Sequence, residues 1–516
     1  MQRRGQENTL GASGGGQARR SARADRTNRA GEVTDISTMG IGPPYYSPLA
    51  RTEVERIDRT GRRILDTIGV RINDGSFLEA LEKRGARVDY EEQRVRFGGD
   101  WLEEVLGRAP SRFTLCSRDG KNDLDLGEGK VYFANGGRVF RILDMRTGGY
   151  RLTTLRDVVN TATLVEHLDN IRFYVIACQV HDLPPQDYHL NDFYHAFNRT
   201  AKHVMGGCDN LQGVRQMWEL ASLIAGGENR LSERPFVSVI VNPISPLTIE
   251  INTLNVLRFC ATHGIPIAFA PAPIAGATAP ATLAGTLAQM HAEALAGVAI
   301  AQMLSPGARV IYSAVPMTMD LRKMELAVGS VEMAMMNAAA VQLGKHCNLP
   351  VYAAGGLTEA KRPDIQSGLE KTISSLTVAM AGADCVRLAA GMLDSGNSIS
   401  YEQYVIDNEA IGMVQRLLAG IKVDEATLGF DVIDKVGPGG NYVREDHTVE
   451  HMMEEFFYPE LGVRSNFDVW EESGRPDMLS RASDVVRTIL RENTEGLLDL
   501  SLTSEIVKTN SGLLGV

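Results

Sequence analysis

Cysteine is scarce in this chain: its 516 residues include six cysteines, and no two of them form a Cys-x-x-Cys pair. They stand at Cys116, Cys178, Cys208, Cys260, Cys347 and Cys385. Scattered single cysteines argue against both a disulfide framework and a four-thiolate zinc site. We therefore expect a reducing environment and a cytoplasmic protein.

The chain also lacks a long apolar run and an excess of positive charge. His291, Glu293 and Gln302 interrupt its longest apolar stretch, which therefore falls short of the roughly 20 residues that a membrane span needs. The 53 basic and 64 acidic residues give a net charge of -11, which argues against a general affinity for nucleic acid or for an anionic membrane. With 44% hydrophobic residues, the sequence instead predicts a soluble enzyme that acts on small ligands.

Composition and pattern divide the chain into four parts. Residues 1–40 are rich in Gly, Ser and Arg and poor in apolar residues, so we expect a disordered tail. A transit peptide has a similar composition, but the apolar region of an export signal is missing. Residues 41–130 form an N-terminal cap with a helical pattern over 49–104. A catalytic domain over 131–425 and a C-terminal helical appendage over 426–516 complete the chain.

Short β-branched or aromatic runs alternate with helix-period runs from residue 131 onward, as in repeated βα units. The expected strands are 131–134, 171–178, 203–206, 236–241, 265–270, 310–314, 351–354 and 385–389. Eight such units predict an α/β fold of the (β/α)8 TIM-barrel type. A doubly wound open sheet is the alternative, but no G-x-G-x-x-G turn follows the first strand.

The helices between these strands carry recognisable signals. Thr154-Leu155-Arg156-Asp157 resembles a capping box and is followed by apolar residues on one helical face. Further helices are expected over 247–263, 281–304, 331–346, 366–381 and 401–421. Some of these segments stop at a glycine such as Gly264 or Gly382.

Catalytic residues of a TIM barrel lie on the loops after its strands. The segment 355–364, after the seventh strand, combines glycines, carboxylates and cations, and 391–404 follows the eighth. Tyr401, Glu402 and Tyr404 offer the aromatic faces and the negative charge that a cationic ammonium ligand needs, although both tyrosines are equally suited to packing the last helix. Loops such as Asn135-Gly136-Gly137 leave room for a large planar group, but tight turns explain these glycines equally well.

No metal site is expected from the histidines. His291 and Glu293 are two residues apart, so they do not share a helical face. His447 and His451 are four apart, but they lack the H-E-x-x-H order.

Several motifs together resemble the trimethylamine methyltransferase family of corrinoid-dependent methyltransferases. The resemblance covers about Arg51 to Arg464. It rests on Leu143-Asp144 with Thr154-Leu155-Arg156-Asp157, on Asp320-Leu321-Arg322, on Ala354-Gly355-Gly356 through Lys361-Arg362-Pro363-Asp364, on Gly391-Met392-Leu393 through Ser400-Tyr401-Glu402-Gln403, and on Gly437-Pro438-Gly439-Gly440-Asn441-Tyr442 with His447-Thr448. The fold that the resemblance implies is a TIM barrel.

The founding members of that family carry pyrrolysine in the loop that here runs Ala354-Gly355-Gly356-Leu357-Thr358, where this chain has standard residues. The resemblance therefore points to the branch without pyrrolysine, which acts on quaternary amines such as glycine betaine. It implies methyl transfer to the cobalt(I) corrinoid of a cognate partner protein. We also expect a homo-oligomer, although no motif sets the oligomeric state or identifies the amine.

This hypothesis assigns roles to ten residues. Tyr132, Tyr352 and Tyr401 are the expected aromatic walls, and Asp364 and Glu402 the counter-charges to the ammonium group; Asp364, Glu402 and Tyr401 are the expected catalytic residues. Asn135, Arg138 and Lys361 are expected to hold a substrate carboxylate, with Gly355 and Gly356 in the substrate-binding loop. Two other functions remain open: a betaine sensor or scaffold without turnover, and a TIM-barrel lyase or isomerase that binds a phosphosugar.

Overall fold

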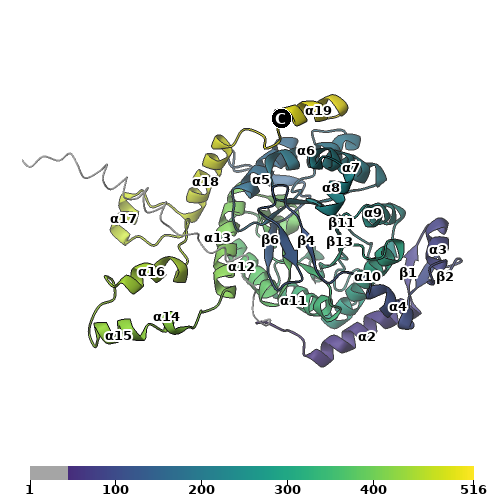
Figure 1. Ribbon diagram of the computed structural model, residues 1–516, viewed down its shortest axis with the longest axis horizontal. Helices are drawn as coiled ribbons and strands as arrows, with labels where there is room; N and C mark the ends of the chain where they lie inside the picture. The colour runs from purple at the N-terminus through teal and green to yellow at the C-terminus, as the bar shows by residue number, and fades with distance from the viewer. Residues whose placement is uncertain (1–44, 516) are drawn as a thin grey trace, which may run out of the picture. The chain divides into compact units, whose positions relative to one another are not determined.

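A closed barrel of eight parallel strands forms the centre of the protein in the computed structural model, which describes residues 45–515 (Figure 1). The strands are β6 (Tyr132–Asn135), β9 (Phe173–Val175), β10 (His203–Gly207), β11 (Val237–Val241), β13 (Ile267–Phe269), β14 (Val310–Ala314), β17 (Val351–Ala354) and β18 (Cys385–Ala390). They follow one another around the barrel in chain order, and β18 pairs with β6. Each lies within or overlaps a strand expected from the sequence, so the TIM-barrel prediction is confirmed.

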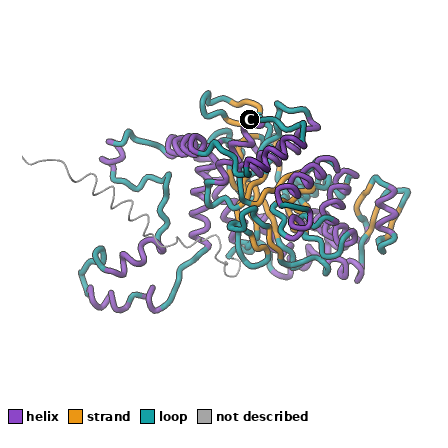
Figure 2. Tube along the Cα trace, turned by 45° about the horizontal axis from the view of Figure 1, so that its top comes forward, coloured by secondary structure: helices purple, strands orange, loops and turns teal. Residues whose placement is uncertain are grey.

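A helix follows each barrel strand and covers it from outside, so the strands lie inside a ring of helices (Figures 1 and 2). The helices are α5 (Leu155–Glu166), α6 (Tyr188–Arg199), α7 (Leu211–Ala225), α9 (Ile251–Thr262), α10 (Leu283–Leu304), α11 (Val331–His346), α12 (Ile365–Met380) and α13 (Tyr401–Leu418), with α8 (Glu228–Glu233) after α7. The predicted capping box begins α5, where the backbone N–H of Thr154 donates to Asp157 over 2.8 Å. Gly297 lets α10 lie against β13, because a methyl group there would collide with the ring of Phe269.

One end of the barrel is closed by a hairpin. Its strands β4 (Phe113–Leu115) and β5 (Leu124–Leu126) place Leu115, Leu124 and Leu126 in one buried cluster with the inward-facing side chains of the barrel. The hairpin comes just before β6 in the chain, so it lies where the strands begin. Enzymes with this fold carry their chemistry at the opposite end, where the strands finish.

Short hairpins cover part of that opposite end. β7 (Arg141–Leu143) and β8 (Tyr150–Leu152) join β19 (Met392–Leu393) and β20 (Ser398–Ile399) in a four-stranded sheet, and β15 (Met319–Asp320) pairs with β16 (Glu325–Leu326). The first sheet thus connects the loops that follow β6 and β18.

The N-terminal cap contains strands as well as helices. Its helices are α2 (Arg51–Thr67), α3 (Gly75–Glu82) and α4 (Gly99–Leu106), and its strands β1 (Val70–Ile72), β2 (Arg87–Asp89) and β3 (Arg94–Arg96) form a sheet with β12 (Thr248–Ile249). The helical pattern expected over 49–104 is therefore interrupted. Three-residue strands such as Arg94-Val95-Arg96 are too short for alternation to be distinguished from a helical pattern.

The region expected as one C-terminal appendage is divided. Gly420–Tyr458, with α14 (Glu425–Leu428), α15 (Phe430–Val436) and α16 (Asp446–Glu455), forms a separate compact unit. α17 (Phe467–Glu472), α18 (Met478–Glu492) and α19 (Leu500–Thr509) belong with the barrel, and α18 packs against α13 and α5. The tail expected over 1–40 lies outside the described residues. Among the described helices, none is long and apolar enough to cross a membrane.

Candidate active site at the open end of the barrel

Solvent enters the barrel where the strands end. Three inward-facing residues near these ends, Gly207, Ile240 and Arg387, keep part of their surface exposed. Two residues earlier on the same strands, the inward-facing Met205, Ser238 and Cys385 are fully buried. The bore is therefore open from its C-terminal end down to the level of Arg387 and closed below it.

Three polar side chains from adjacent strands face the barrel interior at the lower limit of this bore. Arg387 of β18 is partly exposed, whereas Ser313 of β14 and Tyr352 of β17 are fully buried at the level of Cys385. Ser313 pairs directly with Tyr352 across the two strands, and the guanidinium carbon of Arg387 lies 4.9 Å from the centre of the Tyr352 ring. Arg387 pairs with Ala354, whose small side chain leaves space beside the guanidinium group. Tyr352 was among the residues predicted from the sequence, whereas Ser313 and Arg387 were not.

These three side chains have polar atoms without hydrogen-bond partners. The unpaired atoms are the hydroxyls of Ser313 and Tyr352 and the Nε and Nη1 of Arg387, and all four are buried. Burial raises the pKa of Tyr352, although the charge of Arg387 opposes this, so the phenol keeps its proton and can donate. A buried donor without an acceptor typically costs about 1–3 kcal/mol. The bore thus concentrates uncompensated donors and one positive charge.

The two other predicted aromatic walls occupy different places. Tyr132 belongs, like Tyr352, to the buried cluster formed with the closing hairpin, but its hydroxyl accepts the backbone N–H of Asp125 over 3.2 Å, whereas that of Tyr352 has no partner. Tyr401 lies between α13 and α5, where its hydroxyl donates to Asp157 and accepts from Asn160. Of the three tyrosines, Tyr352 alone stands beside Arg387 in the bore.

The two predicted counter-charges make structural hydrogen bonds. Asp364 is exposed and caps α12 by accepting the backbone N–H of Ser367 over 3.0 Å. Glu402 is buried; one of its oxygens accepts from the Ser400 hydroxyl over 2.7 Å, and the other from Ser483 of α18 over 3.2 Å. Their role toward an ammonium group stays a prediction that these contacts do not support.

Replacing Asp364 by Ala separates capping from ligand binding. We expect the variant to lose about 1 kcal/mol of unfolding free energy, because an N-cap acceptor is removed, and to bind substrate with unchanged affinity. Asp364→Ser, which restores a capping oxygen but not the charge, should recover the stability. Chemical denaturation measures the first effect and calorimetry the second; a weaker affinity shared by both variants would instead assign Asp364 to the ammonium group.

The three residues expected to hold a carboxylate are already engaged. The Asn135 amide donates to the carbonyl oxygen of Val175 over 2.7 Å and accepts its N–H over 2.8 Å. Lys361 is exposed and pairs with Asp394. Arg138 donates to Gln179, to the Gly207 carbonyl and to Asp209, and it contacts a ring nitrogen of His189. Protein groups therefore occupy most of the polar atoms that would hold a substrate carboxylate, although the buried Nε of Arg138 has no partner.

An unusual carboxyl group lies beside Arg138. Asp192 of α6 is 2% exposed, its Oδ1 has no hydrogen-bond partner, and its Oδ2 is 3.9 Å from the Arg138 guanidinium. Burial raises the pKa of Asp192 to about 7, although the charge of Arg138 opposes the shift. This acid therefore titrates near neutral pH.

A buried ion pair supports the loops after β17 and β18. The Lys371 ammonium lies 3.2 Å from Asp407 and donates to the carbonyl oxygens of Gly356 and Met392, while Asp407 accepts the N–H of Gly391 over 2.8 Å. Burial lowers the pKa of Lys371 and raises that of Asp407, and each partner's charge opposes the shift of the other. The pair holds the backbone of both loops.

The predicted glycines Gly355 and Gly356 have a steric function in these loops. Gly356 has a φ of +84°, and a methyl group there would collide with the backbone of Ala389. At Gly355 a methyl group would lie 2.9 Å from Val386. Both glycines therefore permit the loop to pack closely against β18, while a role in substrate binding stays a prediction.

One group of residues has the composition of a metal site but is internally satisfied. Ligand atoms of Asp58, His291 and Cys347 lie within 4.8 Å of one another. His291 contacts Asp58 over 2.9 Å and the Tyr312 hydroxyl over 2.8 Å, and both Asp58 oxygens accept from Arg62 at 2.8 Å. Because the Arg62 charge occupies the carboxylate, the cluster attaches α2 to α10 rather than offering a cation site.

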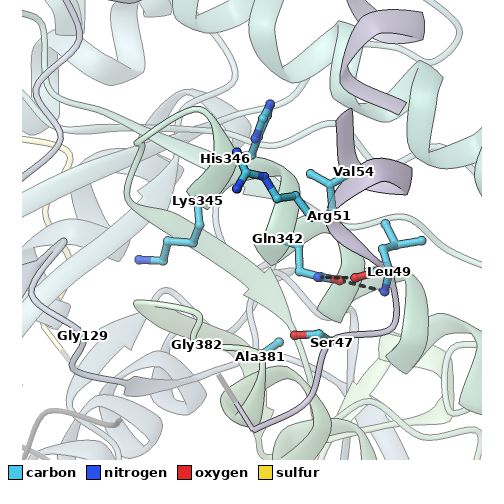
Figure 3. A pocket seen from close by; sticks show the side chains of 10 residues that line it. All are labelled: Ser47, Leu49, Arg51, Val54, Gly129, Gln342, Lys345, His346, Ala381 and Gly382. Carbon is cyan, nitrogen blue, oxygen red and sulfur yellow. Dashed lines mark hydrogen bonds between the residues drawn. The ribbon is translucent and has the colours of Figure 1, made fainter. Parts of the chain in front are cut away.

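A second hollow lies at the other end of the barrel (Figure 3). Gln342 and Leu49 are joined there by two hydrogen bonds of 2.8 and 3.0 Å. The hollow also borders Gly129 and Gly382, which precede β6 and β18. It therefore opens near the strand beginnings, away from the end where barrel enzymes place their chemistry.

Comparisons with known proteins give the family of the chain. The sequence profile of the family Trimethylamine methyltransferase (MTTB) matches residues 13–508. The chain is 35% identical over 442 residues to the trimethylamine methyltransferase MttB of Desulfitobacterium hafniense, covering 86% of this chain and 89% of that protein. It is 32% identical over 433 residues to a glycine betaine methyltransferase of the same species, covering 84% and 90%.

A solved structure supports the fold. The monomethylamine methyltransferase (MtmB) of Methanosarcina barkeri superposes with a TM-score of 0.52 at 13% identity, covering 90% of this chain and 92% of that one. At this identity the likeness concerns architecture alone. Because the profile spans nearly the whole sequence and two relatives exceed 30% identity over most of their length, the chain belongs to the trimethylamine methyltransferase family and is a methyltransferase.

Proposed function

We propose that this protein transfers a methyl group from a quaternary amine of the glycine betaine type to the corrinoid of a cognate partner protein. The observation that carries the proposal is the membership of a family whose relatives include a glycine betaine methyltransferase. The phosphosugar alternative has no support from that membership. A betaine sensor would use the same pocket, so a measurement of methyl transfer distinguishes a sensor from an enzyme.

The charge of the substrate simplifies the work of the protein. A quaternary nitrogen is already positive, so breaking its N–CH3 bond returns the bonding electrons to nitrogen and releases a neutral tertiary amine without an added proton. The reduced cobalt of a corrinoid, when the partner presents it, supplies the electron pair that takes the methyl group. The protein has to orient the N-methyl bond toward the open end and keep water away.

The loop after β17 supports a reaction that does not use pyrrolysine. Its residues Leu357 and Thr358 are standard and buried, and the Thr358 hydroxyl donates to Glu370. They hold the loop in place and carry no electrophile. Activation by the substrate's own charge is consistent with this arrangement.

The open end of the barrel has a surface suited to a protein partner. Small residues, including Ala134, Gly207 and Ala354, lie at or near strand ends, and Gly207 is partly exposed there. Large apolar side chains are exposed on the loops and hairpins after β6, β11 and β14, namely Phe140, Leu152, Ile244, Leu321 and Met324. Exposed apolar side chains that gather on one face are typical of protein contact sites. We place the corrinoid protein here.

We also propose that the protein assembles with further copies of itself. Ile421, Phe430 and Val443 of the unit Gly420–Tyr458 are strongly exposed, which is unfavourable for a surface that faces only water. Sedimentation velocity measures the assembly, and a monomer at all concentrations would contradict it.

Methyl transfer to free cob(I)alamin tests the proposed function. Glycine betaine, carnitine, proline betaine and trimethylamine are offered in turn, and the conversion of cob(I)alamin to methylcobalamin is followed by absorbance. We expect transfer from at least one quaternary amine and none from trimethylamine. Binding of a quaternary amine without transfer, even with a corrinoid protein present, would favour the sensor; transfer from trimethylamine alone would refute the proposed substrate class.

A further inference from the structure

We propose that Arg387, Tyr352 and Ser313 form an anion-binding subsite in the bore, so that the substrate is an onium carboxylate held by its carboxylate at depth. The inference rests on the proposed function for the identity of the cationic end. The subsite itself rests on the unpaired polar atoms of these three side chains.

The charge of Arg387 has no counter-charge among the described residues. Among residues 45–515 no ion pair involves Arg387, although its Nε and Nη1 are buried. Guanidinium N–H groups that are removed from water without an acceptor are unfavourable. The Tyr352 ring at 4.9 Å offsets part of this cost through a cation–π contact but accepts no hydrogen bond from Nε or Nη1. An anion in the bore would supply the missing acceptors.

The shape of a carboxylate group suits the donors around Arg387. A carboxylate is planar and can accept from the two N–H donors on one edge of a guanidinium group, and the buried Nε–H of Arg387 is one donor of such an edge. Arg387 pairs with Ala354 of β17, and this small neighbour leaves space beside the guanidinium group. The hydroxyls of Tyr352 and Ser313, on adjacent paired positions, add two neutral donors. The class of ligand is therefore a carboxylate.

Arg387 differs from Arg138 and Lys361, the two other cations considered at this end of the barrel. Arg138 and Lys361 are both paired with aspartates, Asp209 and Asp394. A ligand carboxylate would have to displace those partners, whereas Arg387 has none to lose. The position of Arg387 on the wall of the bore also places a bound carboxylate below the strand ends.

The charge of Arg387 and the available space set the orientation of a bound betaine. The ammonium group has the same sign of charge as Arg387, so it lies at the far end of a bound betaine. The far end points out of the bore, because the opposite direction is filled by the closing hairpin. The N-methyl groups then face the surface where the partner protein docks.

Calorimetry with glycine betaine and choline tests the subsite, since choline keeps the trimethylammonium group and lacks the carboxylate. We expect glycine betaine to bind the native protein at least tenfold more tightly than choline. Arg387→Met should weaken glycine betaine binding on the order of 100-fold, as expected for a lost charge-assisted bidentate contact, and change choline binding little. Tyr352→Phe and Ser313→Ala should each weaken glycine betaine binding several-fold. Arg322→Ala, on an exposed hairpin, is the matched control and should change neither.

Thermal unfolding of the ligand-free protein separates a binding role from a structural one. Arg387→Met should raise Tm, because it removes two buried N–H donors that have no acceptor. A lower Tm together with unchanged affinity would show that Arg387 supports the barrel and would overturn the inference. If the Met variant does not fold, Arg387→Lys keeps the charge without the planar fork and should still weaken glycine betaine binding; equal affinity in that variant would likewise overturn it.

The outcomes also separate this inference from the proposed function. Methyl transfer from glycine betaine and choline with equal efficiency would refute the carboxylate subsite and leave the methyltransferase function intact. Carboxylate binding that depends on Arg387, with no methyl transfer from any amine, would refute the function and leave the subsite.

Discussion

Replacing Lys371 by Met is expected to lower the free energy of unfolding by about 3–5 kcal/mol, because it leaves the buried carboxylate of Asp407 without its partner. Methyl transfer should fall as well, since the Lys371 ammonium donates to the Gly356 and Met392 carbonyls and so fixes both loops after β17 and β18. Denaturant titration gives the first quantity and the methylcobalamin assay the second.

The double variant Lys371→Met with Asp407→Leu provides the sharper measurement. Because the uncompensated charge is gone, it should recover part of the stability lost by Lys371→Met alone. It should not recover activity, since the loop carbonyls remain without their donor. Lys83→Met, which breaks the exposed pair with Glu79, is the control and should cost less than about 1 kcal/mol. If Lys371→Met lowered the free energy of unfolding by no more than the control, the buried pair would not stabilise the fold.

Asp192→Asn is expected to change how stability depends on pH. Burial raises the pKa of Asp192 to about 7, above the value near 3.9 of an unfolded chain. At a pH between these two pKa values, Asp192 keeps its proton in the folded protein and releases it in the unfolded chain. This contribution to stability is therefore complete below about pH 4 and is lost as pH rises to about 7, an effect of up to about 4 kcal/mol.

The Asn variant cannot lose that proton, so its stability should fall less than that of the native protein between pH 4 and pH 7. Denaturation at pH 5 and at pH 8 measures the difference, and the variant should gain relative to the native protein at the higher pH. Asp434→Asn, at an exposed position, is the control and should follow the native profile. Parallel profiles for the native protein and Asp192→Asn would show that Asp192 is ionised throughout.

Much of the fold was predictable from the sequence. Barrel strands such as 310–314 are buried on both faces, so they appear as short apolar runs, and the helices between them have a longer period and defined caps. The α11 helix has the bounds expected for it, Val331–His346. The sheet of the N-terminal cap was not predictable, because its strands are three residues long and one of its partners, β12, comes from within the barrel domain.

The sequence alone determined the barrel, because strand and helix periodicity are local properties of the chain, and its motifs determined the family resemblance. Tertiary structure decided which polar side chains are free to act. Arg138, Lys361 and Asp364 have the right chemistry, but an aspartate distant in the chain pairs with each of the two cations and a helix end engages Asp364, whereas no carboxylate of the described residues pairs with Arg387. Whether a charge is compensated depends on what folding places around it, and no local pattern records that.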